Sequence, residues 1–140
     1  MLHQDLTQQI LVSFFEVYNE VGRGFLESVY AESLRMALDD SGLAAQREVP
    51  VNVHFRGRVA GRFYADLVVE RRVIIELKVA KLLAKEHESQ LLHYLRATDV
   101  EAGLLLNFGS SPQFKRLLLT NDRKLSLGTQ QPVNTRADPW

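Results

Sequence analysis

Cysteine is absent from the 140-residue chain, so neither a disulfide nor a thiolate metal site is available to it. This absence fits a reducing cytoplasm, which is the compartment we expect. No apolar run approaches the roughly 20 residues of a membrane-spanning helix, and the polar start MLHQDLTQQI lacks a signal-peptide pattern. An excess of one charge is also missing, because 17 basic residues balance 17 acidic ones. A nucleic-acid partner would therefore be attracted by a local basic patch or a bound cation, not by a global field.

The composition is typical of one soluble globular domain, with 46% hydrophobic and 24% charged residues. The length suffices for a single domain with a substantial core. We place that domain in residues 1–120. The polar stretch 121–140 contains Pro132 and Pro139, and we interpret it as a C-terminal tail without fixed structure.

Hydrophobic periodicity predicts two helices, then strands, then a further helix and strand. The helices are expected at 5–21, 25–40 and 84–97, and the strands at 46–55, 59–69, 73–80 and 102–109. Residues 114–120 fit either a strand or a short helix, and periodicity does not decide between them. This order predicts an α/β fold in which helices flank a central mixed sheet.

Three ionisable residues interrupt the apolar hairpin YADLVVERRVIIELKVA, residues 64–80. Glu76 and Lys78 share one face of their strand, because residues i and i+2 point the same way. A three-residue loop at 70–72 would place Asp66 opposite Glu76. Two close carboxylates disfavour ionisation unless a cation lies between them, and magnesium prefers such oxygen ligands. From these three residues alone, a salt bridge at a strand end with Asp66 capping a turn is the plainer interpretation.

Two helical segments carry further polar residues. In GFLESVY, residues 24–30, Glu27 and Tyr30 fall on one helical stripe. Taken alone, Glu27 is a first-turn glutamate favoured by the helix dipole, and Tyr30 is a core residue. In HESQLLHYL, residues 87–95, Gln90 taken alone is a solvated helix residue. His87 there is read as exposed, and the lack of further ligands at suitable spacing excludes a zinc site.

Together these segments resemble the GxxExxY family, a branch of the PD-(D/E)XK nuclease superfamily. The resemblance covers roughly residues 8–120, and its motifs are Gly24, Glu27 and Tyr30, then Asp66 with Glu76-Leu77-Lys78, then Gln90, then GLLLNFG at 103–109. Ala65 stands where the superfamily name has proline. The resemblance implies a restriction-endonuclease-like αβββαβ core, so residues 1–120 would form a nuclease-like domain.

The resemblance also implies a metal site. Asp66 and Glu76 would hold Mg²⁺, with Mn²⁺ as a substitute, and the Leu77 carbonyl would supply a further oxygen. Glu27 would reach in from the second helix as a direct or water-mediated ligand.

The remaining site residues would act on the substrate. Lys78 would orient the attacking water or neutralise developing charge, and Gln90 would orient Lys78 or contact phosphate. Candidate phosphate contacts are Arg56, Arg58, Arg62, Lys81 and Lys85, each of which is equally well explained as a solvated surface charge. Three aromatic residues near these arginines, Phe55, Phe63 and Tyr64, are expected in the core and not as platforms for bases.

The function that the resemblance implies is metal-dependent hydrolysis of phosphodiester bonds in DNA, in a repair, defence or mobile-element context. A noncatalytic nuclease-fold module that binds nucleic acid or a partner protein is the alternative. The complete set of acidic and lysine positions favours the nuclease, whereas the neutral net charge favours the binding module or a missing partner. Many small nucleases pair to cut two strands, so a homodimer fits the first interpretation.

Overall fold

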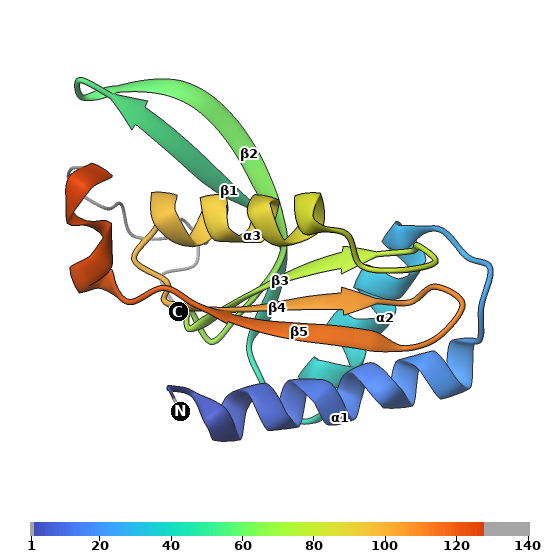
Figure 1. Cartoon of the computed structure of the whole chain (residues 1–140). Coiled ribbons are helices and arrows are strands. Elements are labelled where there is room, and N and C mark those ends of the chain that lie inside the picture. The colour runs from blue at the N-terminus through green and yellow to red at the C-terminus, as the bar shows by residue number, and fades with distance from the viewer. Residues whose placement is uncertain (1, 128–140) are drawn as a thin grey trace.

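A five-stranded sheet lies between helices in the computed structural model, which describes residues 2–127 (Figure 1). The elements are, in chain order, α1 (Gln4–Val21), α2 (Glu27–Asp40), β1 (Ala45–Phe55), β2 (Arg58–Val69), β3 (Val73–Lys78), α3 (Lys85–Ala97), β4 (Ala102–Asn107), β5 (Gln113–Leu118) and the 3-10 helix η1 (Asn121–Leu127). The predicted α/β class is confirmed, and the ambiguous segment at 114–120 forms a strand.

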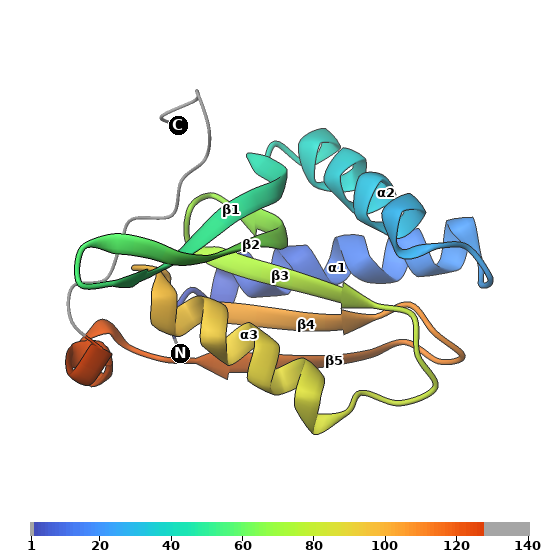
Figure 2. The same cartoon turned by 90° about the horizontal axis from the view of Figure 1, so that it is seen from above.

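The sheet is mixed, with strand order β1-β2-β3-β4-β5. Only β3 and β4 run parallel, and the other neighbouring strands are antiparallel. Helix α3 makes the crossover between the two parallel strands, so it covers one face while α1 and α2 cover the other (Figures 1 and 2). Strand β3 is therefore central and buried on both sides, as its apolar sequence predicts.

Each face of the sheet has its own apolar core, so the direction of a side chain decides which helices it meets. The core under α1 and α2 contains Phe14, Tyr30, Leu34, Ile75, Leu77 and Phe108 among others. The core under α3 contains Val68, Ile74, Leu91, Leu95 and Leu105 among others. Asp66 and Glu76 each lie two residues from a member of the second core, so both carboxylates face α3.

The turn between β2 and β3 fixes the register of the hairpin. Glu70 and Arg71 both have positive φ, 53° and 57°, and the Arg72 amide donates to the Val69 carbonyl oxygen at 2.9 Å. This is the geometry of a type I′ turn, whose twist suits a two-stranded hairpin. Val69 then pairs with Val73 and Leu67 with Ile75, which makes 70–72 the three-residue loop that the sequence predicts.

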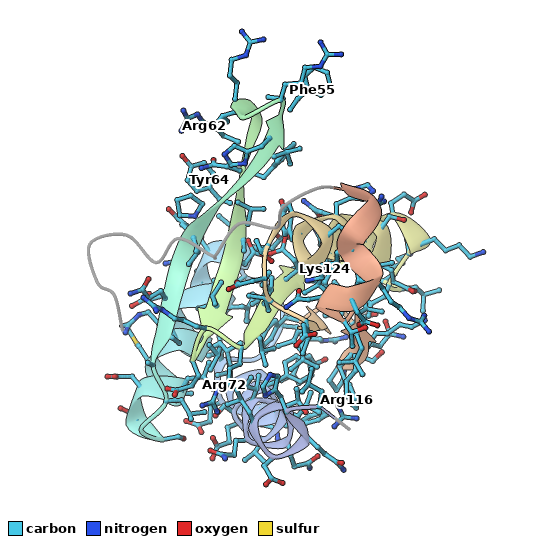
Figure 3. The ribbon with its side chains drawn as sticks, turned by 90° about the vertical axis from the view of Figure 1, so that its left-hand side faces the viewer. Phe55, Arg62, Tyr64, Arg72, Arg116 and Lys124 are labelled. Atoms are coloured by element: carbon cyan, nitrogen blue, oxygen red, sulfur yellow. The ribbon has the colours of Figure 1, made fainter. Side chains whose placement is uncertain are left out.

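The outer part of the β1–β2 hairpin projects beyond the sheet (Figures 1 and 3). β1 and β2 pair along their whole length, but pairing of β2 with β3 is confined to residues 67–69. The prediction that Phe55, Phe63 and Tyr64 are core residues is wrong, because their side chains are 58%, 48% and 57% exposed. The ribbon projects beyond β3 at these positions, because β2 pairs with β3 only at residues 67–69, and Phe63 lines a hollow between the hairpin and α3.

Asn107 and Gly109 join the loops that follow β3 and β4. The buried Asn107 side chain accepts from the Ala80 amide at 3.0 Å and donates to the Ala80 carbonyl at 2.9 Å. A Cβ atom at Gly109 would overlap the Ala80 carbonyl oxygen. Only glycine therefore lets the two loops approach this closely, and the end of β3 is held in place by that approach.

Gly109→Ala is expected to destabilise the protein by about 1–3 kcal/mol or more, because backbone and not a flexible side chain must move to make room. Urea denaturation measures the change. Ser110→Ala is the control, because the Ser110 side chain is exposed, and it should stay within about 0.5 kcal/mol of wild type. Equal stability of the two variants would show that the loops do not need this contact.

The first residues of the predicted tail form a short helix in the structure. Asn121–Leu127 form η1, and the Lys124 ammonium is buried, where it donates to the Thr98 and Val100 carbonyl oxygens at 3.0 Å and 2.6 Å. The rest of that tail, 128–140, lies outside the described residues. Between residues 2 and 127, no helix is long and apolar enough to cross a membrane.

Candidate active site

Asp66 and Glu76 meet where β2 and β3 separate. The next position of the ladder after Leu67–Ile75 would pair Asp66 with Glu76. At that point the two carboxylates, and not main-chain carbonyls, accept hydrogen bonds from main-chain amides. The Asp66 amide donates to Glu76 Oε2 at 2.8 Å, and the Leu77 amide donates to Asp66 Oδ2 at 2.8 Å. The carboxylates thus satisfy two amides that the diverging strands would leave without partners, which is one reason why acidic residues are tolerated here.

Glu76 is the more buried carboxylate of the pair, since it is only 2% exposed whereas Asp66 is half-buried. Burial raises the pKa of Glu76 to about 9, and the negative charge of Asp66 acts in the same direction. The hydrogen bond from the Asp66 amide and the positive charge of Lys78 oppose this rise in the pKa without cancelling it. In the absence of a cation, Glu76 is therefore protonated at neutral pH.

Lys78, Gln90 and Tyr94 form a hydrogen-bonded row beside the two carboxylates. The Lys78 ammonium donates to Gln90 Oε1 at 3.2 Å, and the Gln90 amide donates to the Tyr94 hydroxyl at 3.1 Å. Burial raises the pKa of Tyr94, and the charges of Glu76 and Asp66 raise it further. That electrostatic influence places Tyr94 in the neighbourhood of both acids. Helix α3 thus connects to the end of β3 through side chains one helical turn apart.

In metal-free protein, the free energy of unfolding is expected to fall as the pH rises between about 5 and 9. Native Glu76 keeps a proton up to a pKa of about 9, whereas the unfolded chain releases it near 4.5. The unfolded state then binds fewer protons than the native state, so stability decreases by up to about 1.4 kcal/mol per pH unit. Urea denaturation in chelator across this range measures the slope.

Glu76→Gln should flatten this pH dependence, since glutamine has no proton to lose. The control is Glu20→Gln, which removes an exposed carboxylate from α1. A wild-type slope that Glu76→Gln leaves unchanged would mean that another group carries the pH dependence.

The three residues of the GxxExxY pattern lie at the junction of α1 and α2. Tyr30 is buried, its hydroxyl donates to the Gly22 carbonyl oxygen at 2.6 Å, and its ring stacks on Phe108 at 4.6 Å. This burial and stacking confirm that Tyr30 is a core residue. Gly24 has φ of 103°, a conformation that other residues rarely adopt. Because Phe108 follows β4, the stack places the start of α2 at the end of the sheet where β3 and β4 finish.

Glu27 is the first residue of α2, and its side chain is exposed. The structure does not gather it into one cluster with Asp66 and Glu76. Among residues 2–127, no group of three or more histidine, cysteine, aspartate or glutamate side chains is arranged to hold a metal ion. The acidic centre of the described chain is therefore a pair, and Glu27 stands apart from it.

The other predicted site residues have separate places. The Leu77 side chain packs in the core under α1 and α2, so only its main chain faces the acidic pair. The five basic candidates are all exposed: Arg56, Arg58, Arg62, Lys81 and Lys85. Arg56 and Lys85 line one hollow between the hairpin and α3.

The donor set fits a hard divalent cation. Two carboxylates share an apolar setting, and burial together with the charge of Asp66 raises the pKa of Glu76, so a cation between them would relieve the repulsion. Magnesium is commonly held by one or two carboxylates, with water and phosphate as its remaining ligands. A pair without a third acidic side chain is sufficient for such a site.

Sequence reasoning left out two residues that organise this end of the molecule. The sequence gives no role to Tyr94, although its spacing of four from Gln90 is a signal that the two side chains can meet. Asn107 ends the apolar run GLLLN, much as Lys78 ends VIIELK, and that shared pattern indicates a polar position at a strand end. His87, expected at the surface, is half-buried and accepts from the Ala84 amide at 3.0 Å, which caps the start of α3.

Comparison with known proteins gives the class to which this arrangement belongs. The family model of the PD-(D/E)XK nuclease superfamily matches residues 4–117. The chain is thus a member of the PD-(D/E)XK nuclease superfamily, whose members typically use divalent metals. No curated protein matches the sequence.

Among solved structures, the crystal structure of SSO0001 shares the fold. Its TM-score to this chain is 0.54 with 17% sequence identity, and the match covers 89% of this chain and 64% of SSO0001. At that identity the likeness concerns the fold alone, and it supports the restriction-endonuclease-like core that the sequence predicts.

Proposed function

We propose that this chain is a nuclease that hydrolyses phosphodiester bonds in DNA, with Asp66, Glu76 and Lys78 at its reaction centre. The observation that carries the proposal is the convergence of two carboxylates on the α3 side of β3, with a lysine on the same face. A purely structural pair has no need of the adjoining Lys78–Gln90–Tyr94 row.

Asp66 and Glu76 would hold Mg²⁺ through their carboxylates. When bound, the cation would supply Lewis-acid chemistry to the phosphodiester and acidify water. Glu76 would be ionised in that state, because the positive charge offsets both its burial and the charge of Asp66.

Lys78 would neutralise the charge that grows on the phosphate oxygens during attack. Gln90 holds the ammonium through its Oε1 atom, and Tyr94 holds the amide of Gln90 in turn, so the lysine is oriented before substrate arrives. Such preorganised charge acts most strongly in a site that excludes water.

A metal titration against a panel of nucleic acids tests this function. We expect cleavage in Mg²⁺ or Mn²⁺, none in chelator, and a preference among single-stranded, duplex and RNA substrates. Binding of metal without cleavage of any substrate would favour the noncatalytic module instead.

We also assign the chain to the GxxExxY branch of the superfamily, on Gly24, Glu27 and Tyr30. Glu27 begins α2 at the end of the sheet where β3 finishes, and we assign it a water-mediated contact with the cation or the substrate. Its exposure in the described chain is compatible with a contact that forms only when those ligands are present.

Glu27→Gln is therefore expected to weaken Mg²⁺ affinity while the melting temperature barely changes. If Glu27 only complements the helix dipole, the same change would cost about 0.3–1 kcal/mol of stability and leave metal affinity intact. Calorimetric titration and thermal unfolding of one variant separate these outcomes, with Glu20→Gln as the matched control. Unaltered affinity would remove Glu27 from the site.

A further inference from the structure

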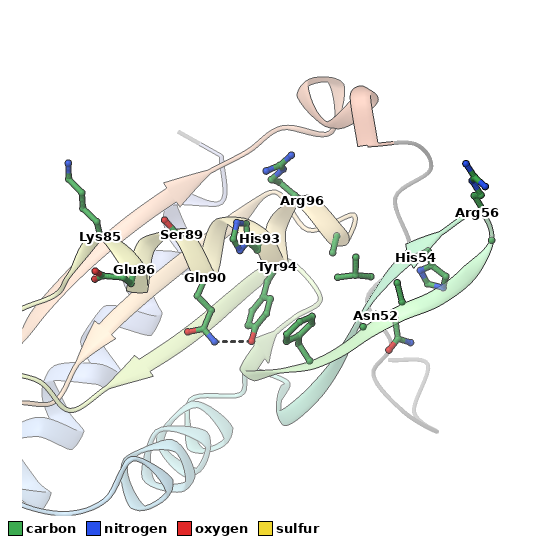
Figure 4. Close-up of a pocket in the computed structure, with 16 residues that line it drawn as sticks. Asn52, His54, Arg56, Lys85, Glu86, Ser89, Gln90, His93, Tyr94 and Arg96 are labelled. Carbon is green, nitrogen blue, oxygen red and sulfur yellow. Dashed lines mark hydrogen bonds between the residues drawn. The ribbon is translucent and has the colours of Figure 1, made fainter.

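A groove of about 1370 Å³ runs between α3 and the projecting β1–β2 hairpin (Figure 4). Its volume exceeds the roughly 300–1,000 Å³ of ordinary small-molecule pockets, so it suits a segment of polymer. One wall is the hairpin, which carries His54 and Arg56, and the other is α3, which carries Gln90, Tyr94 and Arg96 (Figure 4).

The groove is basic although the whole chain has no net charge. Arg56, Lys85 and Arg96 line it against a single acidic residue, Glu86, which leaves two formal positive charges in excess. Outside the groove, Arg62 and Tyr64 are also exposed on the hairpin, where they share one face of β2 (Figure 3). A polyanion would therefore be attracted to this part of the surface in particular.

The groove also presents an aromatic ring to solvent. Phe63 lines it and is 48% exposed, and its ring centroid lies 6.2 Å from that of the buried Tyr94 beneath. Gly61 lies beside this ring, and a Cβ there would approach Phe63 Cε2 to 3.1 Å. The surface thus offers an exposed aromatic ring beside its positive charges.

Gln90 connects the groove to the reaction centre. It lines the groove, and its side chain contacts both Lys78 and the groove residue Tyr94. A chain lying along the groove would therefore lead directly to Lys78 and the carboxylate pair.

We propose that the hairpin and α3 clamp a single-stranded segment of nucleic acid, with a base stacked on Phe63 and phosphates near Arg56 and Arg96. This inference rests on the proposed nuclease function and specifies its substrate class. Within a duplex, both faces of each base are already covered by neighbouring bases, except at the two ends. Away from an end, an exposed ring can stack only on a base that has left the helix, so the ring selects single strands, and stacking tolerates every sequence.

Binding of a fluorescent oligonucleotide in chelator, where cleavage is stopped, tests the clamp without requiring activity. Wild type should bind single-stranded DNA at least about tenfold more tightly than the matching duplex. Binding of single-stranded RNA of the same sequence then shows whether the groove prefers deoxyribose or ribose. Phe63→Leu should weaken single-strand binding about tenfold, since stacking on one aromatic ring contributes about that factor or more. Phe63→Trp should retain it.

Phe114→Leu is the aromatic control, because Phe114 is 42% exposed on β5 and does not line the groove. For the charges, Arg56→Gln with Arg96→Gln should lower the slope of log affinity against log salt by about 0.7 for each lost phosphate contact. Arg72→Gln, at the far end of the molecule from the hairpin tip, should not change that slope (Figure 3).

Photocrosslinking of an oligonucleotide that contains 5-iodouracil locates the base directly, and the expected crosslink is to Phe63. Equal affinity for duplex and single strand, or normal binding by Phe63→Leu with crosslinks outside the groove, would overturn the clamp. Cleavage that ignores Phe63 would remove the clamp and leave the nuclease standing. Groove-dependent binding with no cleavage of any substrate would support the clamp and remove the nuclease function.

Discussion

Lys78→Met is expected to yield a folded protein that binds Mg²⁺ and nucleic acid but cleaves at least about a hundredfold more slowly than wild type. The side chain is half-buried at the end of β3 and donates to Gln90 at 3.2 Å. Methionine keeps much of the apolar stem and removes the charge. Loss of a group that stabilises growing negative charge typically costs on the order of 10²–10³ in rate, or about 2.7–4 kcal/mol of barrier.

The measurement is cleavage of labelled DNA at saturating Mg²⁺, repeated across a pH series to reveal any titrating lysine. Lys81→Met is the control, because Lys81 is exposed beyond the end of β3 and would at most contact a phosphate, which affects binding; at saturating DNA it should cut nearly normally. A wild-type rate from Lys78→Met would remove the lysine from the chemistry.

Asp66→Asn is expected to lower Mg²⁺ affinity by at least about a hundredfold. Changes to groups that merely support a metal ligand already cost about 10–100-fold, so loss of a ligand should cost at least as much. The asparagine carbonyl can still accept from the Leu77 amide, which now bonds to Asp66 Oδ2 at 2.8 Å, so the strand junction should survive. Calorimetric titration measures the loss.

Thermal unfolding gives an independent readout of the same change. Mg²⁺ should raise the melting temperature of wild type, because a ligand that binds only the native state stabilises it, and should leave Asp66→Asn unmoved. Asp40→Asn, which alters an exposed acid at the end of α2, should behave like wild type. Equal Mg²⁺ binding by Asp66→Asn and wild type would refute the assignment of this site.

The sequence predicts the part of the site that depends on local geometry. Strand periodicity puts Glu76 and Lys78 on one face, and the three-residue loop brings Asp66 opposite Glu76, as the register of β2 and β3 confirms. These relations need only the alternation of a strand and the geometry of a turn, both of which act over a few residues. The central position of β3 follows equally from its apolar residues on both faces.

Relations between distant segments could not be predicted in this way. Periodicity tells which side chains share a face but not how closely another element covers it, so Phe63 was expected in the core although it lines a hollow between the hairpin and α3 and is 48% exposed. The stripe that holds Glu27 likewise says nothing of the junction between α1 and α2, which is set by the Tyr30 hydroxyl and by stacking on Phe108. Lys124 and the two carbonyls that it contacts are more than 20 residues apart in sequence, and no local pattern predicts that contact.

The central claim is that the Asp66–Glu76 pair supports metal-dependent cleavage of nucleic acid. Its most direct test is the cleavage rate of wild type and of Glu76→Ala on the same labelled substrates, with Mg²⁺ and with chelator, after thermal unfolding has shown both proteins to be folded. Cleavage by wild type in Mg²⁺ alone, and none by Glu76→Ala, is the result that we predict. Equal cleavage by the two proteins, or no cleavage by wild type despite metal binding, would contradict the claim and favour a noncatalytic binding module.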